Sequence, residues 1–597
     1  MNNTEFYKII DGEIDALVEK YQNDEFLQKQ DTNSRKSYGF LIWFLEFYGG
    51  IVDYVSSITE GRDDNSCDII FDKYDAKDNN KRIFYIVQSK WNTIGKVESK
   101  PDRGDILQAL NEFETILRGD IKEAVNEKLK ARLQELKEHI QSNGEVKFIF
   151  LSLCQPSEST NENIESFIKS QGGQTSFEFI DINRIKNDYI DREYKGIKPI
   201  NPLVKYYNPK ETKVTLEIER LKEQGNHIKV DRPFEAYIFL IRPKTIFELF
   251  EKYGFALFFE NIRNPLIQSN FNEDIEQTAK ENPAFFWYYN NGITAITSIL
   301  PDIRNQAKTI EVTGFQIING AQTVYSLYKV YKEASPSKRE QMDNQGLVTL
   351  RLMQSGGKDF DLNVTRFTNS QNPVKDRDFY ANDLIQERLQ QESYQTNVWY
   401  ERRRGEFRKV PEGVSSVSNE HFANLYLAYF LQQPHKIFSL YGKEKKKNLN
   451  FISSKVDKEG RYEEIFNEKT LYEDMLCAFY LFDINIENGM VVDEYNLNAG
   501  FLFELSFFQI VFEQYITKKY NSYEIACSRK LIALYLKKDY SIVLKVFAFI
   551  RSFIEKNSTK HLNKDGKVIL TGSNYNELFR KMNLEEITVE DIENIQI

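Results

Sequence analysis

The chain has 597 residues, of which 41% are hydrophobic and 28% charged, so it is globular in composition and too long for one hydrophobic core. A formal net charge of −10 excludes a protein that coats long duplex DNA through an overall basic surface, so any contact with nucleic acid must be local. No apolar run reaches the roughly 18 residues of a membrane span, no signal-peptide pattern opens the chain, and the four scattered cysteines disfavour a zinc site.

We therefore expect a cytoplasmic α/β (α+β) protein of three domains, with no membrane segment. Their expected bounds are residues 1–200, 201–412 and 413–597.

Residues 32–50 have the pattern of a helix that ends at Gly49 and Gly50. Its aromatic residues recur at helical spacing, and Glu46 lies among them. A carboxylate in such a setting needs a partner or a metal, unless it lies at the edge of the apolar stripe and reaches water. Both interpretations stay open from the pattern alone.

Two predicted strands joined by a polar turn occupy residues 61–91. Asp68 precedes the first strand, and Gln88 and Lys90 end the second. Because strand side chains alternate, Gln88 and Lys90 point to one face, and Val87 and Ser89 to the other. This arrangement suits a metal beside a phosphodiester, but an exposed hairpin with a polar outer face has the same pattern.

The metal hypothesis rests on oxygen chemistry. Mg²⁺ prefers carboxylate, amide and carbonyl oxygens, which Asp68, the Gln88 side chain and the Ser89 backbone offer, with Glu46 in or near the ligand set. Lys90 would orient an attacking water or stabilise the charged transition state.

Helices over residues 105–139 and strands at 146–153 and 177–182 complete an expected α/β domain with a small mixed sheet. Gly61, Asp64, Asp68 and the Gln88-Ser89-Lys90 run, in that order, resemble the PD-(D/E)XK nuclease core in its QxK variant. The resemblance implies a restriction-endonuclease-like fold and a catalytic set of Asp68, Gln88 and Lys90, with Glu46 as an auxiliary acid. It also implies Mg²⁺ or Mn²⁺ held by Asp68, Gln88, Glu46 and Asp64.

In residues 201–412, strand and helix patterns alternate, which indicates an α+β domain. Asn291–Gly292 predicts a type I′ hairpin turn between FFWYY and ITAI. Asn319–Gly320 predicts a strand-to-helix junction whose exposed N–H groups suit an anion. Either these segments are ordinary turns with satisfied amides, or they bind a ligand through polar residues, for which the candidates are Asn290, Asn291, Asn319, Gly320, Gln322, Thr323, Asn369 and Gln371.

The segment 401–409, ERRRGEFRK, is basic and precedes a predicted all-α region with aromatic-rich helices over 413–597. Its arginines form either a phosphate-contact patch or a solvated loop face. The nucleic-acid candidates of this kind are Arg263, Arg402, Arg403 and Arg404. The C-terminal aromatic residues fit a core or an interface, so a homodimer is left open.

Four motifs in the central part, in chain order, are ENIR at 260–263, FWYYNNGITAI at 286–296, QIINGAQT at 316–323 and FTNSQN at 367–372. Together they resemble the abortive-infection phage-resistance (AIPR) family across residues 258–404. That resemblance implies bacterial antiphage defence and often an N-terminal nuclease-like domain.

The hypothesis from sequence is a metal-dependent nuclease that cleaves nucleic acid, with DNA favoured over RNA, under control of the central domain and a phage-derived trigger. One alternative is an inactive sensor that recognises a phage product or nucleotide. A second is a restriction-type endonuclease.

Overall fold

The computed structural model is mixed α/β, as expected, and divides into two compact units. The first comprises residues 1–369 and 407–411, and the second comprises 370–406 and 412–597. None of the helices in the described ranges is long and apolar enough to cross a membrane. The structure describes residues 1–28, 30–61, 66–74, 81–97, 99, 103–119, 127–171, 175–198, 203, 211–220, 225–261, 270–368, 378, 380–434, 462–489, 499–520, 527–557 and 572–596.

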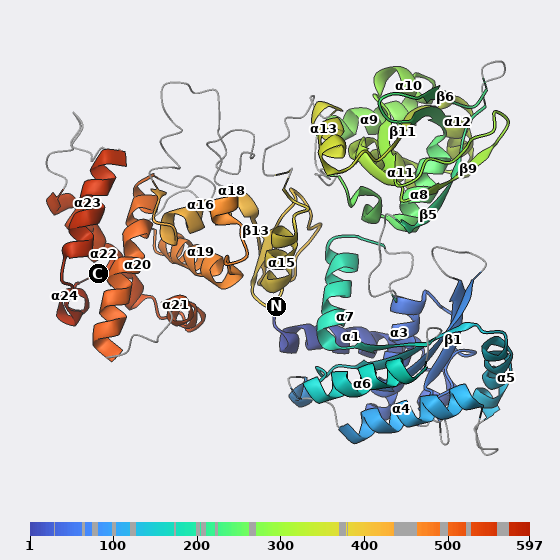
Figure 1. Ribbon diagram of the computed structural model, residues 1–597, viewed down its shortest axis with the longest axis horizontal. Coiled ribbons are helices and arrows are strands. Elements are labelled where there is room, and N and C mark those ends of the chain that lie inside the picture. Colours follow the sequence, from blue (N-terminus) through green and yellow to red (C-terminus); the bar gives the residue numbers. More distant parts are fainter. Residues whose placement is uncertain are drawn as a thin grey trace. The chain divides into compact units, whose positions relative to one another are not determined.

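The first part of unit 1 contains a four-stranded sheet of order β1-β2-β3-β4 (Figure 1). β1 and β2 are antiparallel, with Ile69 opposite Val87, whereas β2–β3 and β3–β4 are parallel. The predicted strands and the mixed sheet are confirmed. Their bounds are β1 (Ile69–Tyr74), β2 (Arg82–Lys90), β3 (Glu145–Ser152) and β4 (Thr175–Ile180).

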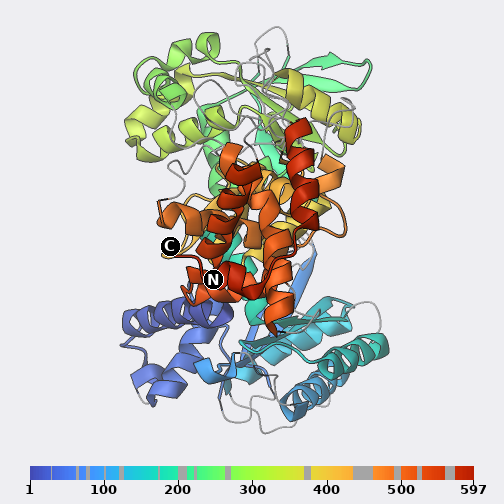
Figure 2. The same cartoon turned by 90° about the vertical axis from the view of Figure 1, so that its left-hand side faces the viewer.

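Helices cover both faces of this sheet, as Figures 1 and 2 show. On one face, the apolar sides of α4, α5 and α6 pack on Phe84 and Phe148. On the other, Phe44 of α3 contacts Phe71, which stacks on Tyr85. The helices are α1 (Asn3–Lys20), α2 (Glu25–Gln28), α3 (Thr32–Phe44), η1 (Leu45–Gly49), η2 (Ile94–Lys96), α4 (Arg103–Arg118), α5 (Glu127–Gln141), α6 (Glu158–Gln171), α7 (Ile182–Tyr189) and η3 (Ile190–Tyr194).

A second, five-stranded sheet follows in unit 1, with the order β10-β8-β11-β7-β6. β8 and β11 are parallel and the other neighbours antiparallel, while β5 pairs separately with β9. The strands are β5 (Lys213–Glu217), β6 (Ile228–Val230), β7 (Ala236–Ile241), β8 (Ile293–Thr297), β9 (Thr309–Thr313), β10 (Gln316–Asn319) and β11 (Val348–Gln354).

Helices α8 and α11 bury one face of this second sheet. Ile246 of α8 and Val324 of α11 lie in one core with Ile293, Ile317 and Leu350. The helices are α8 (Pro243–Tyr253), η5 (Phe255–Phe258), α9 (Asn270–Glu281), η6 (Pro283–Phe285), α10 (Phe286–Tyr289), α11 (Ala321–Glu333), α12 (Pro336–Gln345) and α13 (Lys358–Thr368).

The predicted hairpin at Asn291–Gly292 is wrong. The residues before it form the short helix α10 rather than a strand, and β8 pairs with β10 and β11. Phe286 is buried while the next three aromatic side chains are exposed. The aromatic run favoured a strand by propensity, but it pairs with no strand among the described residues and forms a helical turn that buries Phe286 in the core.

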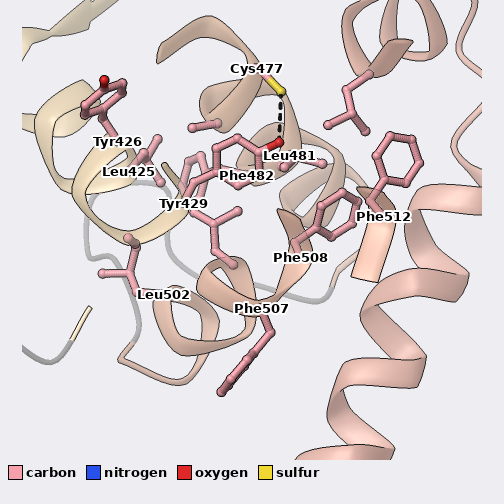
Figure 3. Close-up of a cluster of buried hydrophobic side chains, with 14 of the residues drawn as sticks. Leu425, Tyr426, Tyr429, Cys477, Leu481, Phe482, Leu502, Phe507, Phe508 and Phe512 are labelled. Carbon is pink, nitrogen blue, oxygen red and sulfur yellow. Dashed lines mark hydrogen bonds between the residues drawn. The ribbon is translucent and has the colours of Figure 1, made fainter. Parts of the chain in front are cut away.

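Unit 2 is mainly helical, with one short parallel pair of strands. The region 413–597 is therefore not all-α, because β13 lies within it. Figure 3 shows part of the aromatic core, in which Cys477 Sγ donates to Tyr429 Oη at 3.7 Å. The elements are α15 (Leu384–Ser393), β12 (Val398–Glu401), β13 (Ser415–Ser418), α16 (Asn419–Tyr429), α18 (Tyr462–Ile465), α19 (Tyr472–Glu487), α20 (Ala499–Tyr520), α21 (Cys527–Leu536), α22 (Ser541–Asn557), α23 (Gly572–Leu584) and α24 (Val589–Glu593).

Candidate functional site

Asp68 and Gln88 meet at the edge of the first sheet. The Asp68 backbone N–H donates to Val87 O at 2.9 Å, which continues the β1–β2 ladder by one residue. Gln88 Nε2 donates to Asp68 Oδ2 at 2.9 Å, and the Ser89 N–H donates to the same oxygen at 2.6 Å. Both Asp68 and Gln88 are buried, so these bonds fix the carboxylate against the end of β2.

Lys90 lies on the same face as Gln88. Ile86, two residues before Gln88 on β2, packs into the core beneath α4, so strand alternation directs Gln88 and Lys90 toward that helix. Lys90 Nζ is 3.6 Å from Asp105 Oδ1 in the first turn of α4, and both side chains are about two-fifths exposed, 44% and 42%. The ammonium group therefore lies beside solvent, within reach of an incoming anion.

Glu46 lies in η1, the continuation of α3. Its Oε1 accepts hydrogen bonds from Lys20 Nζ at 3.2 Å and from Tyr21 Oη at 3.0 Å, both on or next to α1. Within the described ranges these are its polar partners, and its side chain is 29% exposed, so the carboxylate both has partners and reaches water. A metal-binding role for Glu46 stays a prediction.

The residues at this edge have the oxygen atoms that a hard cation prefers, but they provide fewer ligands than such a cation needs. Asp68 and Gln88 provide a carboxylate and an amide oxygen, which are oxygen donors that Mg²⁺ or Mn²⁺ accepts. A carboxylate oxygen only accepts, so Gln88 presents its amide nitrogen, not its oxygen, to Asp68. Among the described residues, no group of three or more His, Cys, Asp or Glu side chains could hold a metal, and Asp64 lies outside those residues.

A second polar cluster joins β8 to the start of α11 in the central sheet. Asn290 Nδ2 donates to Thr323 Oγ1 at 3.1 Å, and the Gly292 N–H donates to Asn290 Oδ1 at 2.9 Å. Asn319 Nδ2 donates to the Thr368 carbonyl at 2.8 Å. These amides tie β8, β10, α11 and α13 together.

Gly320 begins α11 in the left-handed conformation, with φ of 91°, and no side chain caps the helix. The predicted strand-to-helix junction is confirmed. Gln322 is half-buried in the first turn of α11, and Asn291 is exposed before β8. The polar candidates Asn290, Asn319, Gly320 and Thr323 are thus brought together, while Asn369, Gln371 and Arg263 lie outside the described residues.

A family model described as AIPR protein matches residues 258–595, more than half of the chain. The chain belongs to the AIPR family. No curated protein and no solved structure matches it. The match confirms the resemblance found in the four motifs and extends it through the helical region. Membership indicates a role in bacterial abortive infection, a form of antiphage defence.

The AIPR match covers α10, the β10–α11 junction and the helical unit, but not the Asp68–Lys90 hairpin. The nuclease-like assignment of residues 1–200 therefore rests on the local sequence pattern and on the geometry described above.

The arginines of segment 401–409 differ in their surroundings. Arg402 and Arg403 are buried; Arg402 Nη1 is 2.8 Å from Glu387 Oε1, and Arg403 Nε donates to Asn382 Oδ1 at 3.1 Å. Burial alone would lower the pKa of Arg402, but the carboxylates of Glu406 and Glu387 outweigh it and raise the pKa. A phosphate would have to replace these bonds, whereas Arg404 is exposed in this AIPR protein.

Sequence reasoning missed Asp105, the partner of Lys90. Its signal was an acidic residue in the first turn of the helix that follows the Gln88-Ser89-Lys90 strand. The contact was not predicted because a polar segment separates β2 from α4 in the sequence, and its length does not indicate that Lys90 and Asp105 lie close together.

Proposed function

We propose that this AIPR protein is a metal-dependent nuclease in antiphage defence, with its active site at Asp68, Gln88 and Lys90. The substrate class is nucleic acid, with DNA favoured over RNA. The AIPR region would restrain or direct cleavage in response to a phage-derived trigger.

The observation that carries the proposal is the convergence at the edge of the first sheet. The Asp68 carboxylate and the Gln88 amide are bonded to each other where β1 begins and β2 ends, and Lys90 follows Gln88 on the same face of β2, with its ammonium group beside Asp105. The carboxylate is buried and fixed, while the ammonium group of Lys90 is partly exposed. In this combination the fixed Asp68 carboxylate can act as a metal ligand, and the Lys90 ammonium group can contact a phosphate of the substrate.

In the proposed reaction Asp68 and Gln88 would hold Mg²⁺ or Mn²⁺, with Asp64 or Glu46 adding negative charge. The bound ion would supply charge neutralisation at the phosphate and a more acidic water. Lys90 would turn from Asp105 toward the phosphate, donate to a non-bridging oxygen and stabilise the charge that develops during attack.

The test is cleavage by the purified full chain of plasmid, linear duplex, single-stranded DNA and RNA, each with Mg²⁺ or Mn²⁺. We expect Lys90→Ala to lower the cleavage rate by at least about 100-fold, the usual cost of removing one charge-stabilising donor. Asp68→Asn should be equally damaging, because it keeps the side-chain shape but removes the charge that attracts the cation.

The matched control is Lys130→Ala, which removes an exposed lysine of α5 that pairs only loosely with Glu127, at 3.8 Å. It should cleave like the wild type. The proposal fails if the wild type cuts none of these substrates with phage lysate added as the trigger source, or if Lys90→Ala and Asp68→Asn cut normally while thermal unfolding reports intact folds.

A second candidate function is an inactive sensor, in which the hairpin serves only as a scaffold. Two observations favour it: Gln88 turns its amide nitrogen toward Asp68, and Lys90 is paired with Asp105. Under this alternative, Mn²⁺ titrated into the full chain would bind equally to the wild type and to Asp68→Asn.

A further inference from the structure

Four aromatic side chains are exposed next to each other in the central part of unit 1. They belong to η6 and α10 and are defined here as the aromatic surface: Phe285, Trp287, Tyr288 and Tyr289, with exposed fractions of 49%, 46%, 71% and 71%. Phe286, between them, is 2% exposed and anchors the segment in the core. Such a contiguous group of exposed rings is unusual on a protein surface and points to a ligand.

The rings contact one another but leave much of their area exposed. Phe285 and Tyr289 stack at 5.7 Å with their planes 17° apart, while Trp287 meets Tyr288 edge-on at 5.2 Å and 85°. Each tyrosine keeps most of its area exposed despite these contacts. Planar partners can therefore stack on both.

Trp287 fixes this surface beside the outer face of the second sheet. Its indole Nε1 donates to Thr349 Oγ1 at 2.9 Å. Thr349 and Arg351 alternate with the core residues Leu350 and Leu352 on β11, so they share the face opposite α8 and α11. Arg351 lies two residues, about 7 Å, farther along that face.

Arg351 supplies a positive charge that no described acidic side chain pairs with. Its neighbours across the sheet are Thr294 on β8 and Ile238 on β7, both uncharged. The side chain is exposed, and within the part of the chain that the structure describes it forms no ion pair. The aromatic surface thus borders a cation directed at solvent.

We propose that the aromatic surface and Arg351 bind single-stranded nucleic acid. Unpaired bases would stack on Tyr288, Tyr289 and Trp287, and a backbone phosphate would contact Arg351. Stacking tolerates any base, because each has a π-face, whereas bases in a duplex are already stacked and hidden. The positive charge of Arg351 favours a polyanion over an apolar protein surface as the occupant. This binding site is separate from the proposed cleavage site and does not depend on cleavage.

The test is binding of the full chain to fluorescein-labelled 20-nucleotide oligo-dT, oligo-rU and a duplex of the same length. EDTA is present, so that loss of binding is distinct from loss of cleavage. We expect single strands to bind more tightly than the duplex and to quench tryptophan fluorescence. Of the four tryptophans, Trp287 is exposed, Trp91 is half-buried, and Trp43 and Trp399 are buried. The double variant Tyr288→Ala with Tyr289→Ala should bind single strands at least about tenfold more weakly.

Arg351→Gln should weaken binding and lower the slope of log affinity against log salt by about one, since one phosphate contact is lost. The matched control is Tyr74→Ala on β1, which removes a tyrosine of similar exposure, 62%, from another sheet. It should bind like the wild type.

The proposal is overturned if the wild type binds no single strand, if it binds the duplex equally well, or if the double variant keeps wild-type affinity. Since the wild type and the variants carry the same intact Asp68 and Lys90, a difference in binding between them is assigned to the aromatic surface and not to the nuclease site.

Discussion

At the scale of single residues, the polar side chains of the candidate site have unequal freedom. Gln88 Nε2 and the Ser89 N–H both donate to the buried Asp68 carboxylate, so its position depends on the end of β2 and not on solvent. Among the residues that the structure describes, Lys90 is held by one long ion pair between partly exposed groups, which contributes little stability. This difference is what the proposed reaction requires, because the cation-binding group must be fixed while the phosphate-binding group moves.

The same scale gives a pH prediction in unit 2. His421 packs against Phe482, with ring centroids 4.9 Å apart, and its Nε2 is buried without a partner among the described residues. Burial lowers the pKa of His421 to about 4, below the usual 6.5, although Glu420 acts in the opposite direction. Between these two pH values the unfolded chain binds a proton that the folded chain does not, so stability falls as the pH falls from about 6.5 to 4.

We expect His421→Phe to lose this part of the pH dependence, worth roughly 2 kcal/mol at pH 4.5. Urea unfolding of the wild type and the variant at pH 7 and pH 4.5 measures it. The wild type should lose more free energy of unfolding than His421→Phe does; equal losses would contradict a buried neutral imidazole.

At the scale of elements, the local sequence pattern predicted the correct secondary structure where the tertiary contacts favour the same structure. Alternation placed Gln88 and Lys90 on one face of β2, and the pairing of Ile69 with Val87 brought Asp68 to Gln88. It failed at α10, where strand-forming aromatic residues have no strand to pair with. Asp105 was missed because its contact with Lys90 depends on how α4 packs, which no local pattern contains.

The β10–α11 junction offers a test of why Gly320 is required. A Cβ there would lie 2.7 Å from the Gly292 carbonyl oxygen and 3.0 Å from Ile293 Cα. Gly357 has a similar φ of 95° but no atom within 4 Å of such a Cβ.

We expect both Gly→Ala variants to lose about 1–2 kcal/mol from the left-handed backbone, and Gly320→Ala to lose roughly 1–3 kcal/mol more from the clash. Urea unfolding of the full chain measures the difference. Equal destabilisation of the two variants would contradict this expectation, because it would mean that Gly292 and Ile293 move away from the new Cβ at no cost in free energy.

At the scale of the whole molecule, the chain enters unit 2, returns to unit 1 for residues 407–411 and enters unit 2 again. In that return the Arg408 N–H donates to Tyr194 O at 2.8 Å, and its guanidinium lies over Phe255 at 5.4 Å. The sequence left open whether the arginines of segment 401–409 form a phosphate-contact patch or a solvated loop face. In the structure Arg402 and Arg403 are buried, with Arg402 paired to Glu387 and Glu406. Burial of this kind depends on long-range packing and cannot be read from a short charge pattern.

The central claim, that the Asp68–Lys90 site provides the antiphage function of this AIPR protein, is tested most directly by infection. Wild type, Lys90→Ala and Lys130→Ala are expressed at equal levels in a phage-sensitive bacterial host that is challenged with a broad phage panel. We expect wild type and Lys130→Ala to reduce plaque formation by some phages and Lys90→Ala to give none of this protection. Protection by Lys90→Ala equal to that of the wild type would contradict the claim.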